Sequence, residues 1–264
     1  MAIYQDEYIK VGSTTVHVLS GGQGEPLLFL HGAGGGGRWL PFMEELSKTY
    51  RVIAPEHPGF GKSDDPEWME DISDWVIFYS DFINQLGHDK VHLVGVSLGG
   101  WMAAEFAVYF RERLQSLTLV DAAGIYVNGV QTGDMFTWNR ETLFRNTFYN
   151  KEMGEQYASY QLNEEETEIW IKNRETTAKI SWNPRWFNPK LEKRLYRIDV
   201  PTLIVWGDHD RLFPLEYAHA YQQLIPHAEL AVIKECGHTP NVEKPGEFAE
   251  KVTAFLKGSS TLKK

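Results

Sequence analysis

Residues 91–110, VHLVGVSLGGWMAAEFAVYF, decide the fold of this chain. Residues 91–94 form an apolar run typical of a buried strand, and Leu98 to Phe110 reads as a buried helix. Ser97 lies between them in the frame Gly-x-Ser-x-Gly. A strand that turns sharply into a helix can expose such a serine at the top of a sheet, and flanking glycines leave room for the neighbouring backbone. The structural alternative is a small residue in a tight turn.

A base must accompany this serine, because its hydroxyl is a poor nucleophile until a neighbour takes its proton. The chain has nine histidines. His238 follows Cys236 and Gly237 on a loop just past a predicted strand at residues 229–234. A histidine there can swing over a site at the carboxyl edge of a sheet. A surface loop histidine is the alternative interpretation.

The base in turn needs a carboxylate to hold it in the right tautomer. Residues 201–205 (PTLIV) read as a buried parallel strand, and a loop with Asp208 and Asp210 follows. Asp208 directly follows a glycine and suits a turn that it caps itself. Asp121 ends another predicted strand, at residues 117–120. We therefore rank Asp210 first as the orienting acid, then Asp121, then Asp208.

Serine, aspartate and histidine occur in this order along the chain, each after a predicted strand. In this respect the chain resembles the α/β-hydrolase superfamily, in particular its serine carboxylesterases. Further motifs carry the resemblance from about residue 27 to the final helix: His31-Gly32-Ala33-Gly34, Gly59-Phe60-Gly61-Lys62-Ser63, Val200-Pro201-Thr202-Leu203 and Gly237-His238. It implies an α/β fold with a mostly parallel eight-stranded sheet flanked by helices and a helical cap insertion.

The resemblance also implies a role for each site residue. Ser97 would be the nucleophile, His238 the base and Asp210 the acid. The backbone N–H groups of Ala33 and Leu98 would form the oxyanion hole. Haloalkane dehalogenases and epoxide hydrolases of this fold use an aspartate nucleophile, so a serine argues against both.

The strand–helix rhythm is interrupted once along the chain. Residues 122–195 contain no convincing strand, and the rhythm resumes near residue 201. We therefore expect residues 1–121 and 196–264 to form the core domain and residues 122–195 to form a helical cap above the serine.

Aromatic residues of the cap predict a hydrophobic substrate pocket, for which ordinary core packing is the alternative. The residues expected to bind substrate are Trp101, Trp138, Trp182, Trp186 and Phe187. Arg174 and Arg185 would suit a substrate carboxylate or, equally, a solvated helix face.

The glycines of residues 32–37 also fit a dinucleotide-binding pattern, with Glu56 near the place of a ribose-binding acid. This nicotinamide or flavin alternative leaves Ser97, Asp210 and His238 without a role. We expect no cofactor. We expect no metal either, because no second cluster of ligands accompanies Asp208-His209-Asp210.

The amino-acid composition limits the kinds of molecule that this protein is expected to bind. The net charge is -10 without a basic cluster, which argues against nucleic acid, and no run approaches membrane-spanning length. The single cysteine excludes an internal disulfide. With no evident signal peptide, we expect a cytoplasmic monomer or homodimer that acts on a small molecule.

These observations predict a serine hydrolase that cleaves esters of small hydrophobic or aryl substrates. Carbon–carbon bond hydrolases of ring-cleavage pathways, lactonases, perhydrolases and amidases share the same triad. The carbon–carbon hydrolases commonly carry asparagine and tryptophan where this chain has Val96 and Thr239. A receptor that binds a small molecule without turnover is the alternative of another class.

Overall fold

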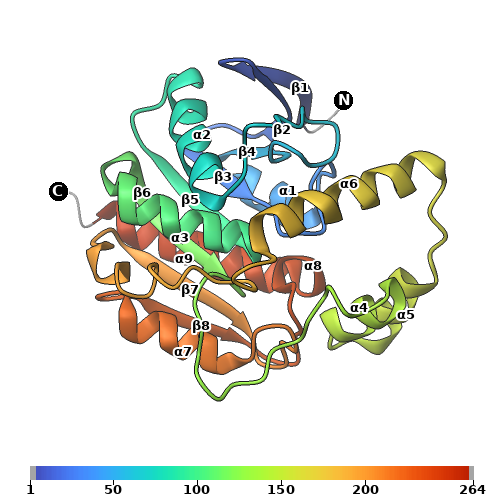
Figure 1. Ribbon diagram of the computed structural model, residues 1–264. Coiled ribbons are helices and arrows are strands. Elements are labelled where there is room, and N and C mark those ends of the chain that lie inside the picture. Colours follow the sequence, from blue (N-terminus) through green and yellow to red (C-terminus); the bar gives the residue numbers. More distant parts are fainter. Residues whose placement is uncertain (1–3, 262–264) are drawn as a thin grey trace.

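Buried apolar runs form the middle of an eight-stranded sheet in the computed structural model, which describes residues 4–261. The strands are β1 (Tyr4–Val11), β2 (Thr14–Gly21), β3 (Pro26–Leu30), β4 (Arg51–Pro55), β5 (Val91–Val96), β6 (Leu114–Val120), β7 (Thr202–Gly207) and β8 (Glu229–Ile233). Their order across the sheet is β1-β2-β4-β3-β5-β6-β7-β8 (Figure 1). β2 pairs antiparallel with β1 and β4, and the other neighbours are parallel. The predicted α/β-hydrolase sheet is confirmed.

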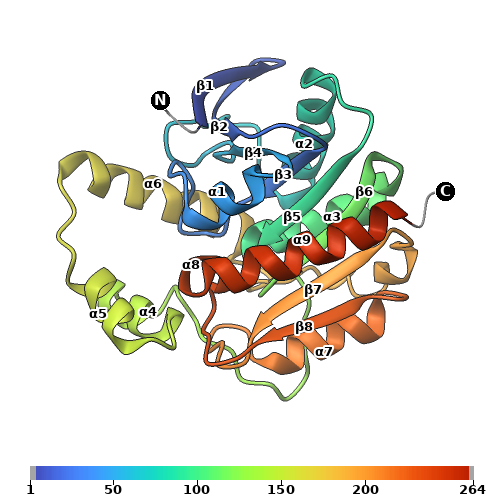
Figure 2. The same cartoon turned by 180° about the vertical axis from the view of Figure 1, so that it is seen from behind.

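Helices cover both faces of this sheet. α1 (Pro41–Ser47) and α9 (Pro245–Thr261) lie on one face, and α2 (Ile72–Gln85), α3 (Leu98–Phe110) and α7 (Leu215–Leu224) lie on the other (Figures 1 and 2). The short elements are α8 (Pro240–Glu243) and the 3-10 helices η1 (Arg111–Arg113) and η2 (Leu195–Arg197). Such a sandwich buries the central strands on both sides, which explains their continuous apolar sequences.

The alternation of side chains along β3 shows how the core is divided. Leu27 and Phe29 pack with residues of α1 and α9, whereas Leu28 and Leu30 pack with residues of α2 and α3. Successive residues of a strand point to opposite faces, so one short strand supplies both halves of the core. β3 and β5 are thereby fixed as a rigid base for the turns that follow them.

The long connection between β6 and β7 is helical. It contains α4 (Arg140–Thr147), α5 (Lys151–Ser159) and α6 (Glu164–Ser181), and residues 121–201 contribute no strand to the sheet. Each helix starts at an asparagine whose side chain accepts a backbone N–H of the first turn: Asn139, Asn150 and Asn163. α4 and α5 lie together, and α6 lies separately from them on the same side of the sheet (Figures 1 and 2). The domain bounds given above stay a prediction, and residues 1–3 and 262–264 of the core domain lie outside the described residues.

Candidate active site

Ser97 occupies the sharp turn between β5 and α3. Its backbone has φ 55° and ψ -114°, a conformation that is costly for any residue except glycine. The Ser97 N–H donates to the carbonyl of Val120 at 2.9 Å, which ties the turn to β6. A Cβ atom on Gly99 would lie 2.2 Å from the carbonyl oxygen of Leu30, and one on Gly95 would lie 2.2 Å from that of Gly99. The two glycines therefore permit the close packing that holds the strained serine.

Ser97, His238 and Asp210 are joined in series. The His238 Nε2 atom lies 2.9 Å from the Ser97 Oγ atom, and Nδ1 lies 2.8 Å from the Asp210 Oδ2 atom. All three side chains are buried. The other oxygen of Asp210 accepts the N–H groups of Leu212 at 2.7 Å and Phe213 at 3.1 Å. These donors favour an ionised Asp210, which makes His238 Nδ1 a donor and leaves Nε2 to accept the serine proton.

The other two candidate acids have different partners. The Asp208 Oδ1 atom lies 2.7 Å from His209 Nδ1 and accepts the backbone N–H of Cys236 at 3.3 Å, so Asp208 links its turn to the loop that precedes His238. Asp121 is fully buried at the end of β6, and its Oδ1 atom accepts the N–H of Gly207 at 3.1 Å. Of the three candidate acids, Asp210 is thus the one whose carboxylate forms a hydrogen bond with His238.

The loop after β3 reaches the serine. A Cβ atom on Gly32 would lie 3.2 Å from the Ser97 Cβ atom, and Ala33 shares the lining of one cavity with Ser97. Leu98 opens α3 directly after the serine. The backbone N–H groups of Ala33 and Leu98 are therefore carried by the two segments that flank the Ser97 side chain.

Two histidines whose rings are in contact, His31 and His57, form hydrogen bonds that fix this loop. The backbone N–H of His57 donates to His31 Nε2 at 3.0 Å, so the His31 proton is on Nδ1, which donates to the Gly32 carbonyl at 2.7 Å. Burial lowers the pKa of His31 to about 4. Burial and the neighbouring His31 also hold the pKa of His57 well below its ordinary range. Both rings are therefore neutral near pH 7 and act as fixed hydrogen-bonding groups.

Glu56 has a structural setting that differs from a ribose-binding acid. Its Oε2 atom accepts the N–H of Lys62 at 2.9 Å and lies 2.9 Å from His17 Nδ1. The helix after the glycine run starts only at Pro41, four residues past Gly37, whereas a pyrophosphate site needs a helix that starts at the glycines. The glycine run instead forms a wall of the cavity beside Ser97.

Helix α6 adds a group that the sequence reasoning missed. The Asn173 side chain is buried; its Oδ1 accepts the N–H of Gly61 at 2.9 Å, and its Nδ2 donates to the Gly34 carbonyl at 3.3 Å. Thr176 donates to the Gly59 carbonyl at 2.7 Å. Polar residues recur along α6 at helical spacing, but only the structure shows that this polar face is buried: Asn173, Thr176, Thr177 and Ser181.

A second missed group, Glu243, fixes the loop of the histidine. Its carboxylate accepts the N–H groups of Gly237 at 2.9 Å, Tyr149 at 3.1 Å and Asn150 at 2.6 Å. The His238 N–H donates to the Thr147 carbonyl at 2.7 Å. The base is therefore positioned by contacts with the cap, and no sequence motif indicated this.

A cavity of about 430 Å³ opens above Ser97 and His238. Most of its lining is apolar and comes from the cap and from the loops after β3 and β5. Its apolar lining residues include Met135, Leu143, Phe144, Phe148, Tyr157, Leu162, Ile169, Trp170, Leu212 and Val242. Four cationic side chains and two carboxylates complete the charged part of the lining: Arg38, Lys62, Arg140, Arg174, Glu56 and Glu166.

The five aromatic residues expected to bind substrate lie elsewhere. None of Trp101, Trp138, Trp182, Trp186 and Phe187 lines this cavity. Trp101 is buried within α3, with its indole N–H donating to Glu105 at 3.2 Å. The other four belong to the outer cap: Trp186 stacks on Phe136, Trp182 is 56% exposed, Phe187 packs on Tyr126 and Trp138 lies against Gly133. The structure corrects the pocket lining to residues of α4, α5 and α6.

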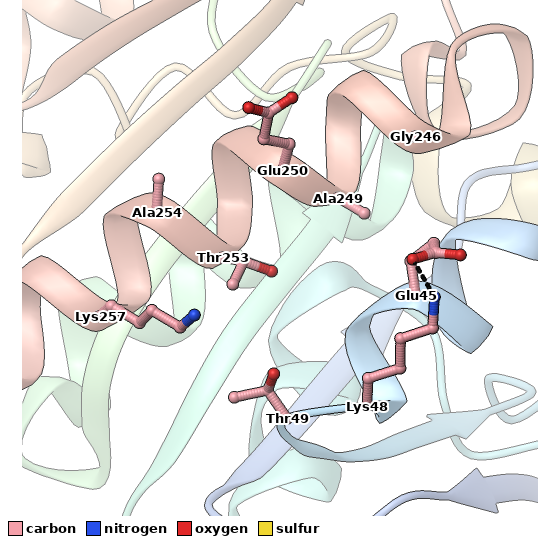
Figure 3. Close-up of a pocket in the computed structure, with 9 residues that line it drawn as sticks. All are labelled: Glu45, Lys48, Thr49, Gly246, Ala249, Glu250, Thr253, Ala254 and Lys257. Carbon is pink, nitrogen blue, oxygen red and sulfur yellow. Dashed lines mark hydrogen bonds and ion pairs between the residues drawn. The ribbon is translucent and has the colours of Figure 1, made fainter.

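A further hollow of about 460 Å³ lies between α1 and α9 (Figure 3). Its hydroxyl groups are those of Thr49 and Thr253, and its lining contains no histidine. Glu45 and Lys48, which form an ion pair, lie at its edge. The hollow therefore offers no nucleophile with a base, and the cavity above Ser97 is the candidate active site.

The set Asp121, Asp210 and His238 brings three polar atoms within 4.8 Å of one another. Two of these residues already form the series with Ser97. Within residues 4–261, no helix is both long and apolar enough to cross a membrane.

Comparisons with known proteins identify the family of this chain. 2-Hydroxy-6-oxo-2,4-heptadienoate hydrolase of Pseudomonas putida is 30% identical over 266 residues, 94% of this chain and 95% of that protein. Lipase 1 of Psychrobacter immobilis is 28% identical over 252 residues, 88% of this chain and 77% of the lipase. The crystal structure of a membrane phospholipase A superposes with a TM-score of 0.84 at 26% identity, covering 98% of this chain and 87% of that one. The family model for the alpha/beta hydrolase fold matches residues 25–245, and the chain belongs to this family.

Proposed function

We propose that this protein is a serine hydrolase that cleaves carboxylic esters of small hydrophobic or aryl substrates through an acyl-serine intermediate. One observation carries the proposal: Ser97, His238 and Asp210 form an unbroken series of hydrogen bonds at the floor of a largely apolar cavity. Nucleophile, base and orienting acid in contact are the arrangement that acyl transfer requires. Relatives named as hydrolases support an enzymatic role.

The proposed reaction has two steps. His238 Nε2 takes the Ser97 proton as Oγ attacks the ester carbonyl, and the C–O bond of the tetrahedral intermediate then breaks. The alcohol leaves with the proton from His238, and the acyl group remains on Ser97. Water next attacks the acyl-serine and gives its proton to His238. The bond between the acyl carbon and Oγ then breaks, Oγ takes the proton back from His238, and the acid is released. Asp210 stays ionised throughout and stabilises the imidazolium that forms in each step.

Negative charge on the substrate oxygen would be held by the backbone N–H groups of Ala33 and Leu98. One such donor is worth about 2.7–4 kcal/mol of transition-state stabilisation in a comparable hydrolase. The hydrogen bonds of His31 and Asn173 to the Ala33 loop support this assignment, because an oxyanion hole is effective only when its donors are fixed in advance.

Two side chains beside the reacting groups favour ester cleavage over carbon–carbon bond cleavage. Val96 precedes the serine, Thr239 follows the histidine, and both line the cavity. The carbon–carbon hydrolases that this chain resembles commonly have asparagine and tryptophan there. An apolar Val96 cannot donate a hydrogen bond to a polar dienol substrate.

A second candidate function is the cleavage of carbon–carbon bonds in dienoate products of ring cleavage. The relatives favour it, since one of them is named a heptadienoate hydrolase. The cavity favours it as well, because its lining carries four cationic side chains against two carboxylates, although the whole chain has a net charge of -10. A local positive excess suits a substrate with a carboxylate group.

Turnover assays with purified protein separate these functions. We expect p-nitrophenyl butyrate and phenyl acetate to be turned over repeatedly, and a dienone ring-cleavage product and lactones to react more slowly. Ser97→Ala should abolish activity, whereas Ser47→Ala on α1 should keep it. A dienone rate above every ester rate would replace the proposal by the second candidate. Binding without multiple turnover would indicate a receptor.

The proposal also includes the expected setting of the enzyme, a cytoplasmic monomer or homodimer that acts on a small molecule. The single cysteine supports a compartment without disulfide formation. Light scattering on the purified protein measures the oligomeric state, and a mass above that of a dimer would contradict this part of the proposal.

A further inference from the structure

Asp121 is a buried carboxyl group beside the candidate triad. It follows β6, the strand between β5 and β7, and therefore lies between the turns that carry Ser97 and Asp210. Its N–H donates to the Val205 carbonyl at 3.1 Å, and its backbone has a positive φ of 43°. A non-glycine residue rarely adopts this conformation unless its surroundings impose it. The side chain is thus firmly held, with no measurable exposure.

The two oxygens of Asp121 have different surroundings. Oδ1 accepts the Gly207 N–H at 3.1 Å, whereas Oδ2 is buried and receives no hydrogen bond from any donor within residues 4–261. An unsatisfied buried oxygen is costly and needs an explanation. A proton on Asp121 resolves the cost, because a carboxylate oxygen of Asp210 lies within 4.8 Å of one of Asp121 and can accept the hydrogen bond.

Two neighbouring carboxyl groups in a buried site share one proton, because both cannot ionise together. Three donors surround Asp210, namely the N–H groups of Leu212 and Phe213 and Nδ1 of His238, whereas Asp121 has one. Asp210 is therefore the ionised member. Burial, and next the charge of Asp210, raise the pKa of Asp121 well above its ordinary range.

We propose that Asp121 is a second acid of this site: a positioning residue that donates a hydrogen bond to Asp210 as a neutral carboxylic acid and orients His238 itself when the Asp210 carboxylate is removed. The geometry allows the exchange, because a polar atom of Asp121 lies within 4.8 Å of one on His238 and of one on Asp210. This inference depends on the proposed hydrolase function.

Kinetics of Asp210→Ala test the exchange. Removal of the acid from a serine triad costs about 10⁴-fold in kcat. If Asp121 replaces it, the loss in Asp210→Ala should be smaller, about 10²-fold, and the double variant Asp210→Ala/Asp121→Asn should show the full loss. Asp210→Ala/Asp208→Asn is the matched control, since Asp208 contacts His209 and Cys236 rather than His238, and it should equal Asp210→Ala. Equal kcat values for Asp210→Ala and Asp210→Ala/Asp121→Asn would overturn the proposal.

The pH dependence of Asp210→Ala activity distinguishes the proposed role of Asp121 from a purely structural one. A purely structural role would leave this pH dependence unchanged. Other titratable groups near Asp121 are His238, Glu243 and Cys236, and all of them remain in this variant. Because Asp121 must then lose its proton to orient His238, we expect the activity of Asp210→Ala to need a higher pH than that of the wild type. If the activity of Asp210→Ala falls toward low pH at the same pH as that of the wild type, Asp121 does not replace Asp210.

Infrared difference spectra test the protonation state without any activity. At pH 7 the wild type should show a C=O stretch of a protonated carboxyl group that is lost in Asp121→Asn and kept in Asp208→Asn. Absence of that difference would show that Asp121 is ionised and would overturn the proposal. Failure of the hydrolase function is distinguishable, because either the wild type would turn over no ester or Ser97→Ala would keep the wild-type rate, whatever the spectra show.

Discussion

Acid should destabilise the fold through His31, the buried histidine behind the proposed oxyanion loop. In the folded protein, Nε2 accepts the N–H of His57 at 3.0 Å and Nδ1 donates to the Gly32 carbonyl at 2.7 Å. A second proton would have to enter at Nε2, where it would face the donor of His57. Burial without a compensating carboxylate therefore lowers the pKa of His31 to about 4.

The size of this effect follows from the difference between the two states. The unfolded chain protonates this ring below its ordinary pKa of 6.5, whereas the folded protein does so only near 4. Stability therefore falls as the pH falls through 6.5, and the loss levels off below about 4. Between pH 7 and pH 5, linkage gives about 2 kcal/mol of lost unfolding free energy from this one ring.

Urea unfolding at pH 7 and pH 5 measures the loss, and His31→Gln removes the titration while keeping an acceptor for His57. We expect the wild type to lose about 2 kcal/mol more between the two pH values than His31→Gln loses. His219→Gln, on the exposed side of α7, should behave like the wild type. The same pH dependence in the wild type and His31→Gln would refute the reasoning.

Three further changes should have defined effects. Gly99→Ala should destabilise the fold by more than about 3 kcal/mol in urea unfolding, because its Cβ atom would lie 2.2 Å from the Leu30 carbonyl oxygen. Gly246→Ala, with nothing within 4 Å, should be near neutral, and equal effects would disprove the steric argument. Asn173→Ala should lower kcat about tenfold, since the loss of two buried hydrogen bonds frees the oxyanion loop, and an unchanged kcat would mean that α6 does not position it. Burial raises the pKa of the Cys236 thiol, so native protein should resist iodoacetamide until urea unfolds it, and rapid labelling of native protein would contradict this.

The sheet could be predicted from sequence because its signals are local. The strands of the core are short apolar runs between turn residues, and the strand–glycine–serine–glycine–helix order of residues 91–110 has few structural solutions. The structure places α3 at Leu98–Phe110, the range that the sequence indicated. α1 starts at Pro41, because proline is favoured at the first helical position.

The contacts among Ser97, Asp210 and His238 could also be predicted from sequence. Parallel strands bring their carboxyl ends to one edge, so residues that follow β5, β7 and β8 had to meet there. The choice of Asp210 over Asp121 was less secure, because both follow strands at that edge. Only the structure shows that Asp210 contacts His238 while Asp121 contacts Gly207.

The pocket could not be predicted, since cap helices carry no register that fixes which aromatic side chains face the serine. Trp170 lines the cavity, whereas Trp182, on the same stretch of chain, is 56% exposed. The positioning roles of Asn173 and Glu243 were missed because both act on backbone groups far away in sequence. Such partners depend on tertiary packing and leave no motif.

Mass spectrometry of a rapidly quenched reaction tests the central claim most directly. Protein mixed with p-nitrophenyl butyrate and quenched in acid should gain the mass of one butyryl group, and digestion should locate it on Ser97. Ser97→Ala should gain no mass under the same conditions. Repeated turnover without any acyl group on Ser97, or an acyl group on another residue, would contradict the account.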